Sequence, residues 1–501
     1  MSGSAPRDVE SAIENGLAAL GGGREELTIA GLAEVARQSP NHAPLWQVLG
    51  LLHRAAQDSM GAVDSFARAT KLAPGDSKIA HGLAQALYEA GLPSLDAFGR
   101  ALALNPKDRG VIQGMIAATL ADRGAGEAIA LADRAMRVDP LWLDGHWLLS
   151  RLRYANGEAA DATLSIEQAL ADRPRDANLW QHWLYTVMKG ERFDEALALL
   201  PRVRSALGAS PYLQLIEAYL LSETGSIEQA EAIFAASAPP GDVGLAIHRI
   251  RHELRMGRPA AAEAFCAPWI GTAQDHLIYP YISIAWRLTG DPRWDALEGS
   301  PALVGTYDIL RDIADFANLV TMVRTLHNQQ GQPLEQSLRG GTQTDGLLLS
   351  RVEPEIRELR SALVKAIIKH VDGLPAPRAG HPQLAWSRNF PIRFAGSWSV
   401  RFQSSGHHAG HVHPGGWFSS ALYLALPETV GKGRGREGWL TLGKPHETLG
   451  IDLPELYNIE PKLGELTLFP STMWHGTVPY PSGERMSVAF DVAVPPQPAI
   501  A

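Results

Sequence analysis

The sequence has little cysteine and no concentration of positive charge. Cys266 is the single cysteine in 501 residues, which excludes a disulfide framework and a cysteine-based zinc site. The formal net charge is −9 without a basic block, which argues against nucleic acid as a partner. No apolar run approaches the roughly 20 residues of a membrane helix, and the first residues lack a basic-then-apolar signal pattern. We therefore expect a soluble, cytoplasmic protein without membrane partners.

Strand-like alternation is nearly absent from the first half of the chain, where Ala and Leu recur at helical spacing. Prolines interrupt this half at intervals of 34, 32, 34 and 34 residues, at Pro40, Pro74, Pro106, Pro140 and Pro174. A fixed period near 34 is typical of helix-turn-helix solenoids. We predict an α-solenoid over residues 8–295.

Residues 43–74 show the repeat unit most clearly. Trp46, Leu49 and Gly50 fall on its first helix, and Ala62, Phe66 and Ala69 on its second. These offsets resemble those of the tetratricopeptide repeat. Small residues allow two helices to cross closely, and such arrays have a concave surface that often holds a protein or peptide segment. We expect the array to present a protein or peptide substrate on that surface.

Residues 296–380 are predicted to be a helical linker. Two helices are expected there, over Tyr307–Leu326 and Pro354–Val371. Between them, Gln336–Thr344 is neither helical nor strand-like. Two interpretations stay open: a plain surface loop, or a loop folded over a functional site with Arg339 or Gln343 contacting a substrate. A Pro- and Gly-rich segment at 374–382 then favours a domain boundary.

Short β-runs between turns begin near residue 383. They cover Ser397–Gln403, Phe418–Leu426, Trp439–Leu442, Glu465–Phe469 and Met486–Val494. Strands at this spacing suggest a sandwich or barrel of the jelly-roll type. We therefore predict a multidomain α + β protein in which residues 381–501 form a C-terminal β domain.

Histidines are concentrated at one point of this β domain. Gly406–Trp417 contains four histidines within seven positions, and His411 and His413 would face the same side of an extended strand. A third candidate, His475, follows a later β-run. Neutral imidazole is a common ligand for first-row divalent metals, so these three residues predict a metal site. His407 and His408 are expected in the solvent or behind the ligands, and His446 on a surface turn.

The stretch 397–494 resembles the double-stranded β-helix core of iron(II)- and 2-oxoglutarate-dependent oxygenases. That family commonly carries His-x-Asp/Glu, a distant histidine, and Arg or Lys about ten residues further on. Here His411, His413, His475 and Arg485 occupy these positions, and Gly406 stands five residues before the first histidine. The whole chain resembles bacterial tetratricopeptide-repeat proteins with such a C-terminal oxygenase domain.

The resemblance implies roles for individual residues. His411 and His475 would bind Fe(II), and Arg485 would bind the distal carboxylate of the cosubstrate 2-oxoglutarate. Ser487 and Tyr423 are further candidates for that carboxylate, and Trp417 is a candidate for the substrate pocket. Oxidative decarboxylation with O₂ would yield succinate and the oxidant that hydroxylates a C–H bond. Glu484 is expected to face away from the site, because it neighbours Arg485 on one strand.

His413 stands where the family usually has a carboxylate. Three neutral histidines leave the +2 charge of the ion uncompensated until dianionic 2-oxoglutarate binds. His413 could instead hydrogen-bond a bound water, and a three-histidine site also suits zinc, although a zinc hydrolase gives no reason for Arg485. Two other functions stay open beside hydroxylation of a protein or peptide. They are small-molecule oxidation, favoured if the oxygenase domain blocks the concave face, and a non-catalytic scaffold that senses metal or 2-oxoglutarate.

Overall fold

The structure is a computed structural model, and it describes residues 5–329, 331, 333, 334, 337–428, 430 and 435–496. Gln336, the first residue of the predicted loop, and residues 497–501 of the predicted β domain lie outside the described residues. In the described part, no helix is both long enough and apolar enough to cross a membrane.

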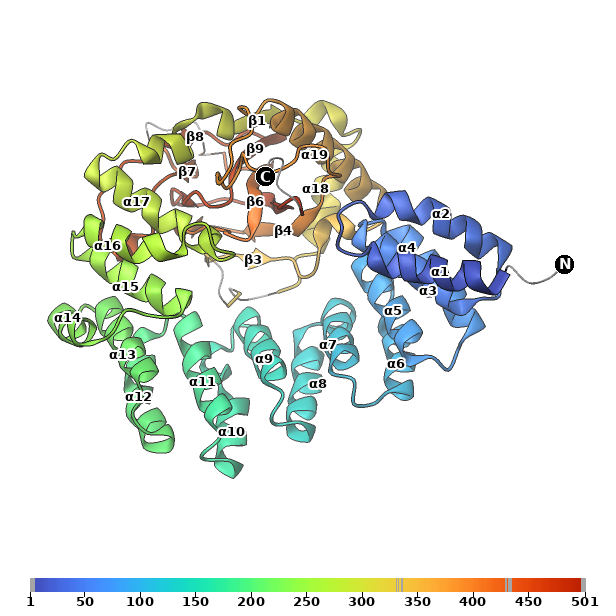
Figure 1. Cartoon of the computed structure of the whole chain (residues 1–501), viewed down its shortest axis with the longest axis horizontal. Helices are drawn as coiled ribbons and strands as arrows, with labels where there is room; N and C mark the ends of the chain where they lie inside the picture. Colours follow the sequence, from blue (N-terminus) through green and yellow to red (C-terminus); the bar gives the residue numbers. More distant parts are fainter. Residues whose placement is uncertain are drawn as a thin grey trace.

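An array of antiparallel helices forms the N-terminal part and follows the predicted repeat (Figure 1). Its helices are α1 (Ala5–Ala18), α2 (Glu25–Gln38), α3 (Ala43–Ala55), α4 (Ser59–Leu72), α5 (Ser77–Glu89), α6 (Leu95–Leu104), α7 (Arg109–Arg123), α8 (Ala125–Val138), α9 (Leu143–Ala155), α10 (Leu164–Asp172), α11 (Ala177–Lys189), α12 (Phe193–Leu207), α13 (Pro211–Glu223), α14 (Ile227–Ala236), α15 (Val243–Arg255), α16 (Pro259–Cys266) and α17 (Tyr279–Thr289). The predicted solenoid is confirmed.

Glycine sets the spacing of the best-defined repeat. A Cβ atom on Gly50 of α3 would lie 2.6 Å from the Phe66 ring of α4, and one on Gly82 of α5 would lie 2.3 Å from it. Phe66 therefore lies between α3 and α5, and any side chain larger than that of glycine at position 50 or 82 would force these helices away from its ring. Helix α5 begins after Asp76, whose carboxylate accepts from two backbone amides and caps the helix.

The C-terminal part is built from antiparallel strands. They are β1 (Gly305–Asp308), β2 (Leu338–Arg339), β3 (Thr342–Gln343), β4 (Phe394–Phe402), β5 (His407–His408), β6 (Gly416–Ala425), β7 (Leu440–Leu442), β8 (Tyr457–Ile459), β9 (Glu465–Pro470), β10 (His475–Thr477) and β11 (Arg485–Ala493). They form a six-stranded sheet in the order β1-β9-β6-β11-β4-β3, a three-stranded sheet β10-β7-β8, and the pair β2-β5. The five predicted strands correspond to β4, β6, β7, β9 and β11, and the predicted α + β class is confirmed.

The two faces of the six-stranded sheet have different neighbours. One face packs on α18 (Phe316–Thr325) and α19 (Pro354–Asp372), where the buried side chains include Phe418, Leu422, Val488 and Phe490. The other face turns Phe469 towards Leu440 and Leu442 of the three-stranded sheet. This second face, which points away from α18 and α19, is called the inner face below. It carries Arg485 and Ser487, because alternate residues of β11 point to opposite sides of the sheet.

The prediction of one helix over Tyr307–Leu326 is wrong. Residues 305–308 form strand β1, in which Tyr307 pairs with Leu466 of β9, and α18 begins only after Asp315, which caps it. Pairing with the free edge of β9 outweighs the local helical pattern. The segment predicted as a linker thus contributes three strands, β1, β2 and β3, and both covering helices to the β domain.

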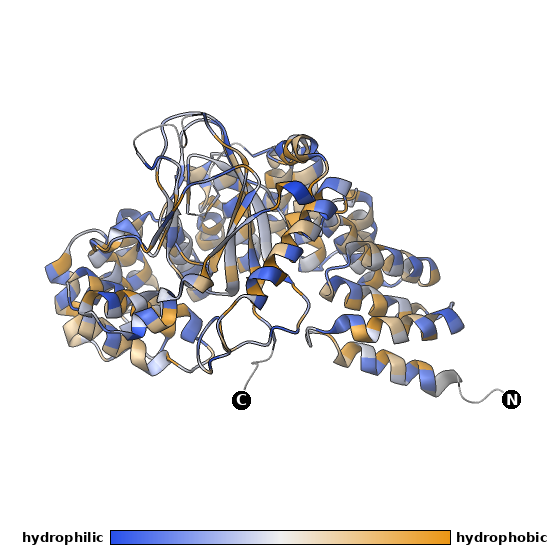
Figure 2. Cartoon of the chain, turned by 90° about the horizontal axis from the view of Figure 1, so that it is seen from above, coloured by the Kyte–Doolittle hydropathy of each residue, from blue (hydrophilic) through white to orange (hydrophobic). Residues whose placement is uncertain are grey.

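The helical array curves around the β domain (Figures 1 and 2). Near α3, Gln57 donates from Nε2 to the carbonyl of Phe394 at 2.8 Å, and at α17 the Trp474 indole donates to the Pro280 carbonyl at 2.9 Å. Further hydrogen bonds along the arc join Ser59 to Ser350, Tyr88 to Asp345, and Ala155 to Gly331. The concave face of the array is therefore occupied in large part by the protein's own β domain.

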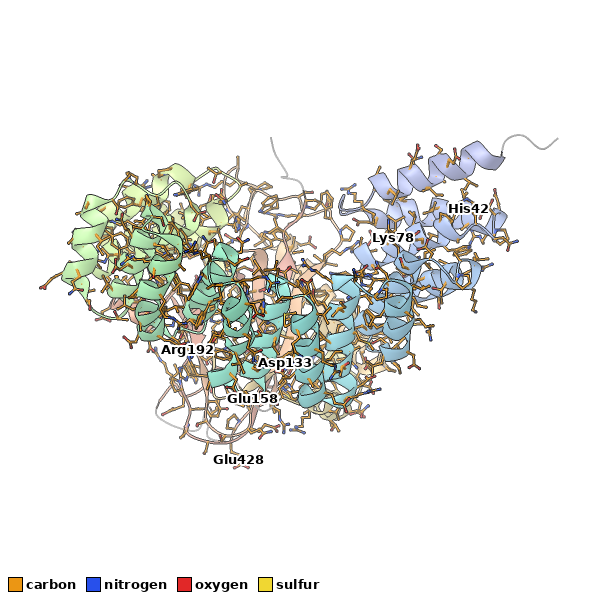
Figure 3. The ribbon with its side chains drawn as sticks, turned by 90° about the horizontal axis from the view of Figure 1, so that it is seen from below. His42, Lys78, Asp133, Glu158, Arg192 and Glu428 are labelled. Carbon is orange, nitrogen blue, oxygen red and sulfur yellow. The ribbon has the colours of Figure 1, made fainter. Side chains whose placement is uncertain are left out.

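A cavity of about 870 Å³ remains between the concave face and the β domain. Its walls include Lys78 and His81 on α5, Gln113 on α7, and Trp398 on β4. Lys78 is labelled in Figure 3, where the helices follow one another along the arc towards Arg192.

Candidate metal and cosubstrate site

Three histidines meet on the inner side of the β domain. His411 lies between β5 and β6, and its backbone exchanges two hydrogen bonds of 2.9 Å with His475, the first residue of β10. The His413 amide donates to the Ser471 carbonyl at 2.9 Å. One nitrogen of each imidazole lies within 4.8 Å of the others, so the three rings can surround one metal ion. His411 and His413 lie in an irregular segment between β5 and β6, although a single extended strand was predicted for them.

Hydrogen bonds fix the tautomer of each ring. Nδ1 of His411 lies 2.9 Å from the Ala409 carbonyl, and Nδ1 of His475 lies 3.0 Å from the Met473 carbonyl. A carbonyl oxygen only accepts, so Nδ1 carries the proton and the lone pair is on Nε2. This is the arrangement of metal-binding histidines, whose second nitrogen donates to an oxygen.

Burial keeps the rings of His475 and His411 neutral. It lowers the pKa of His475 to about 3, with a further lowering from the nearby His413. It lowers the pKa of His411 well below its usual 6.5, and the neighbouring histidines act in the same direction. Imidazole binds a metal only when neutral, so these two rings are in the metal-binding form at pH 7.

A carboxylate lies directly behind His413. Both oxygens of Asp491 are 2.9 Å from His413 Nδ1, and the Ser419 hydroxyl donates to Oδ1 of Asp491 at 2.6 Å. The three histidines carry no negative charge of their own, and Asp491 supplies one through its hydrogen bond with His413. Asp491 was not predicted, but the sequence has a signal for it: an even spacing places it on the same face of β11 as Arg485 and Ser487.

Substitution of Asp491 by Asn is expected to weaken metal binding about 10- to 100-fold, because loss of a carboxylate behind a ligating histidine costs that much elsewhere. The Asn side chain can still accept from His413 but carries no charge. Competition with a chelator, using Co(II) or Fe(II), measures the effect. Asp452→Asn, at an exposed position, is the control. Equal metal affinity of Asp491→Asn and the wild-type protein would contradict a role for this carboxylate.

Arg485 is a buried guanidinium without a full set of partners. Its side chain is only 2% exposed, and Nε and Nη1 are buried without a hydrogen bond. Nη2 donates weakly to the Tyr423 hydroxyl at 3.5 Å, with the guanidinium 5.2 Å from the centre of that ring. A buried charge that lacks partners is costly, and a bidentate carboxylate would supply the missing bonds. The residues present therefore fit 2-oxoglutarate.

Other polar groups border the same space. Tyr480 has a buried hydroxyl without a partner, and burial raises its pKa to about 12. Ser487 pairs across the sheet with Tyr423, so both side chains share the inner face with Arg485. Gly406 forms a backbone bridge with Tyr480. Only glycine fits at this position, because a Cβ atom there would lie 2.1 Å from the Phe402 ring. Tyr480 is a site residue that the sequence analysis missed.

Comparison with known proteins agrees with this geometry. Residues 396–491 match the family model described as "Putative 2OG-Fe(II) oxygenase". The match lies within the C-terminal β domain, hereafter the oxygenase-like domain, and the helices of the N-terminal array follow a spacing that resembles tetratricopeptide repeats. No curated protein matches the chain.

Solved structures similar to parts of this chain include tetratricopeptide repeat proteins. One from Parabacteroides merdae has 16% identity and a TM-score of 0.30, over 56% of this chain and 99% of that one. MamA from Desulfovibrio magneticus RS-1 has 20% identity and a TM-score of 0.30, over 35% and 99%. An O-GlcNAc transferase mutant from Thermobaculum terrenum has 21% identity and a TM-score of 0.26, over 28% of each chain.

The loop residue Ser337, directly before strand β2, reaches the candidate metal site of the oxygenase-like domain. The Ser337 hydroxyl lies 3.1 Å from His408 Nδ1 and 3.2 Å from His411 Nε2, and Arg339 pairs with His407 across β2 and β5. This favours the interpretation of a loop folded over the site. His408 is half-buried beside His411, with the two ring centroids 5.9 Å apart.

Three predicted residues lie outside this group. Trp417 is buried in the helix-covered core and donates to the Gln383 carbonyl at 2.8 Å, so it does not line a substrate pocket at the histidines. Gln343 pairs with Val400 at the sheet edge and borders the 870 Å³ cavity. Glu484 faces away from the site as predicted, and it is bound by Arg324 and Arg401.

Proposed function

We propose that the oxygenase-like domain is a 2-oxoglutarate- and Fe(II)-dependent dioxygenase that hydroxylates a C–H bond. The observation that carries this proposal is the buried, incompletely paired guanidinium of Arg485 on the same inner face as the three histidines. A zinc hydrolase would need the histidines but would have no use for a buried cation beside them. A carboxylate cosubstrate that binds a metal ion accounts for both the three histidines and the buried guanidinium of Arg485.

Each residue has a role in the proposed reaction. His411, His413 and His475 would hold the ion through Nε2, and Arg485 with the Tyr423 hydroxyl would bind the distal carboxylate of 2-oxoglutarate. Once bound, iron and 2-oxoglutarate supply the chemistry in which O₂ converts 2-oxoglutarate to succinate and CO₂ and a substrate C–H group to an alcohol. Asp491 fixes the orientation of the His413 ring throughout.

The substrate proposed from the sequence is a protein or peptide presented by the concave face. The contacts of that face with the oxygenase-like domain support the small-molecule alternative instead, because the domain fills much of the surface that a peptide would need. The 870 Å³ cavity still has room for a short segment, since ligand pockets of proteins span about 300–1,000 Å³.

The first test is anaerobic titration of the Fe(II)-loaded protein with 2-oxoglutarate. We expect a weak visible charge-transfer band that disappears when oxygen is admitted, with formation of succinate. A protein that binds neither iron nor 2-oxoglutarate would contradict the proposal. A protein that binds both but forms no succinate would support the scaffold that only senses them.

A further inference from the structure

Ser337 has its side chain between two histidines of the oxygenase-like domain. Its hydroxyl oxygen lies 3.1 Å from Nδ1 of His408 and 3.2 Å from Nε2 of His411. His411 is one of the three candidate ligands, and Nε2 is the nitrogen whose lone pair is available to the ion. The Ser337 hydroxyl is therefore on the side of the His411 ring where the ion would bind.

The backbone of Ala409 fixes this arrangement. Its amide donates to the Ser337 carbonyl at 2.9 Å, and its carbonyl accepts from Nδ1 of His411 at 2.9 Å. Next to it, Leu338 and His408 pair in the β2–β5 ribbon. One residue thus holds both the backbone of Ser337 and the imidazole ring of His411. Their separation is set by the backbone and does not depend on the serine hydroxyl.

The direction of the two hydrogen bonds follows from the tautomer of His411. Nδ1 of that ring carries the proton, so Nε2 can only accept, and the single hydroxyl hydrogen of Ser337 donates to it. Nδ1 of His408 must then donate to the hydroxyl oxygen. His408 therefore holds the Ser337 oxygen in place beside the three candidate ligands.

The distance of 3.2 Å between the Ser337 oxygen and His411 Nε2 falls in the range expected for two ligands of one ion. Bonds from a first-row metal to nitrogen or oxygen are about 2.1 Å long, which places neighbouring ligands about 3.0 Å apart in octahedral and about 3.4 Å apart in tetrahedral geometry. An ion on Nε2 takes up the lone pair to which the hydroxyl donates. The hydroxyl hydrogen then turns away, and an oxygen lone pair faces the ion.

Ser337 also borders a cleft next to the candidate metal site. The cleft has a volume of about 380 Å³, opens between the helical array and the oxygenase-like domain, and is lined by Ser337 and His411. The hydroxyl therefore stands where a molecule in the cleft would approach the ion. Three neutral histidines and a neutral hydroxyl leave the +2 charge of the ion uncompensated, so a dianionic ligand is favoured over the hydroxyl.

We propose that Ser337 is a fourth protein ligand of the ion, and that 2-oxoglutarate displaces it on binding. The three histidines hold the ion throughout. The hydroxyl, oriented by His408, fills one further position until the cosubstrate arrives. The inference rests on the proposed function, because that function supplies the ion and the cosubstrate. It adds a ligand from the segment between α18 and α19, outside the residues 396–491 that match the family model.

Replacement of Ser337 by Cys tests contact between this side chain and the ion. A thiolate bound to Co(II) gives an intense near-ultraviolet charge-transfer band, which nitrogen and oxygen ligands do not give. We expect this band when full-length Ser337→Cys is titrated with Co(II). Ser482→Cys, at an exposed position between β10 and β11, is the matched control and should give no band. The buried Cys266 is common to both variants.

Two further replacements test the exchange with the cosubstrate. Ser337→Ala should weaken Co(II) binding up to about tenfold and leave 2-oxoglutarate binding unchanged or tighter, because no ligand has to be displaced. Ser337→Asp should bind Co(II) more tightly and 2-oxoglutarate more weakly, because a carboxylate is harder to displace than a hydroxyl. A serine that only anchors the loop would not produce these opposite changes. Calorimetric titration measures both affinities, and circular dichroism confirms that the variants are folded.

The role of His408 is tested in the same titrations. His408→Leu removes the donor to the hydroxyl and should weaken Co(II) binding as Ser337→Ala does. His408→Asn keeps a donor near the position of Nδ1 and should restore the affinity.

The inference is overturned if Ser337→Cys binds Co(II) without the band, or if Ser337→Ala and Ser337→Asp bind Co(II) and 2-oxoglutarate like the wild-type protein. Neither result would affect the proposed function. The opposite case is also distinguishable. A band in Ser337→Cys, together with a wild-type protein that does not bind 2-oxoglutarate, would overturn the proposed function and leave Ser337 as a metal ligand.

Discussion

Replacement of Arg485 by Met is expected to weaken 2-oxoglutarate binding by at least about 100-fold. The guanidinium would make two charge-assisted hydrogen bonds with the distal carboxylate, each contributing about 1.5 kcal/mol or more. Without cosubstrate, the same change should leave the thermal unfolding midpoint unchanged or raise it, since it removes a buried charge with two unpaired nitrogens. Titration calorimetry and thermal melts with and without 2-oxoglutarate measure both effects.

Arg401→Met is the matched control for this prediction. Arg401 lies on the neighbouring strand β4 but on the opposite face, where it pairs with Glu484 at 2.8 Å. It should keep 2-oxoglutarate affinity. If Arg485→Met bound 2-oxoglutarate as tightly as the wild-type protein, the cosubstrate assignment would be wrong.

Substitution of His475 by Ala is expected to remove tight metal binding. One of three ligands is lost, so the decrease should exceed the 10- to 100-fold associated with residues behind the ligands. The backbone pair between residues 475 and 411 does not depend on the side chain, and the fold should therefore persist. Metal content after dialysis against a weak chelator, together with circular dichroism, gives the result.

His276→Ala, in the short 3-10 helix Asp275–Leu277 outside the site, controls for a general effect of losing a histidine. Iron affinity of His475→Ala equal to that of the wild type would refute the metal site. Zinc should be measured in parallel, because the three-histidine set also suits that ion.

The local patterns of the sequence predict most of the elements. The 34-residue period identifies the array because each repeat buries its core against its neighbours, and the alternation in residues 397–494 identifies strands that are buried on one or both faces. The spacing of His411, His413 and His475 predicts the group that the structure brings together.

Relations between distant segments were not predictable in the same way. Strand β1 was read as helix, since only the edge of β9, some 160 residues later, makes residues 305–308 extended. The partner of His413 depends on which strand lies beside β6. The position of the array around the β domain depends on single contacts, such as Gln57 with Phe394, that have no periodic pattern.

The closure of the arc has a mechanical consequence. An open solenoid bends and twists easily, because each repeat touches only the next and small rotations accumulate along the array. Here hydrogen bonds attach the β domain near both ends of the array, at Gln57 and at Pro280, and they restrict bending of the array. The curvature of the array therefore sets the width of the cleft of about 380 Å³ that Tyr219 and His248 of the array line together with His411. Mutations on the convex side, far from any ligand, can alter that width by changing the stiffness of the arc.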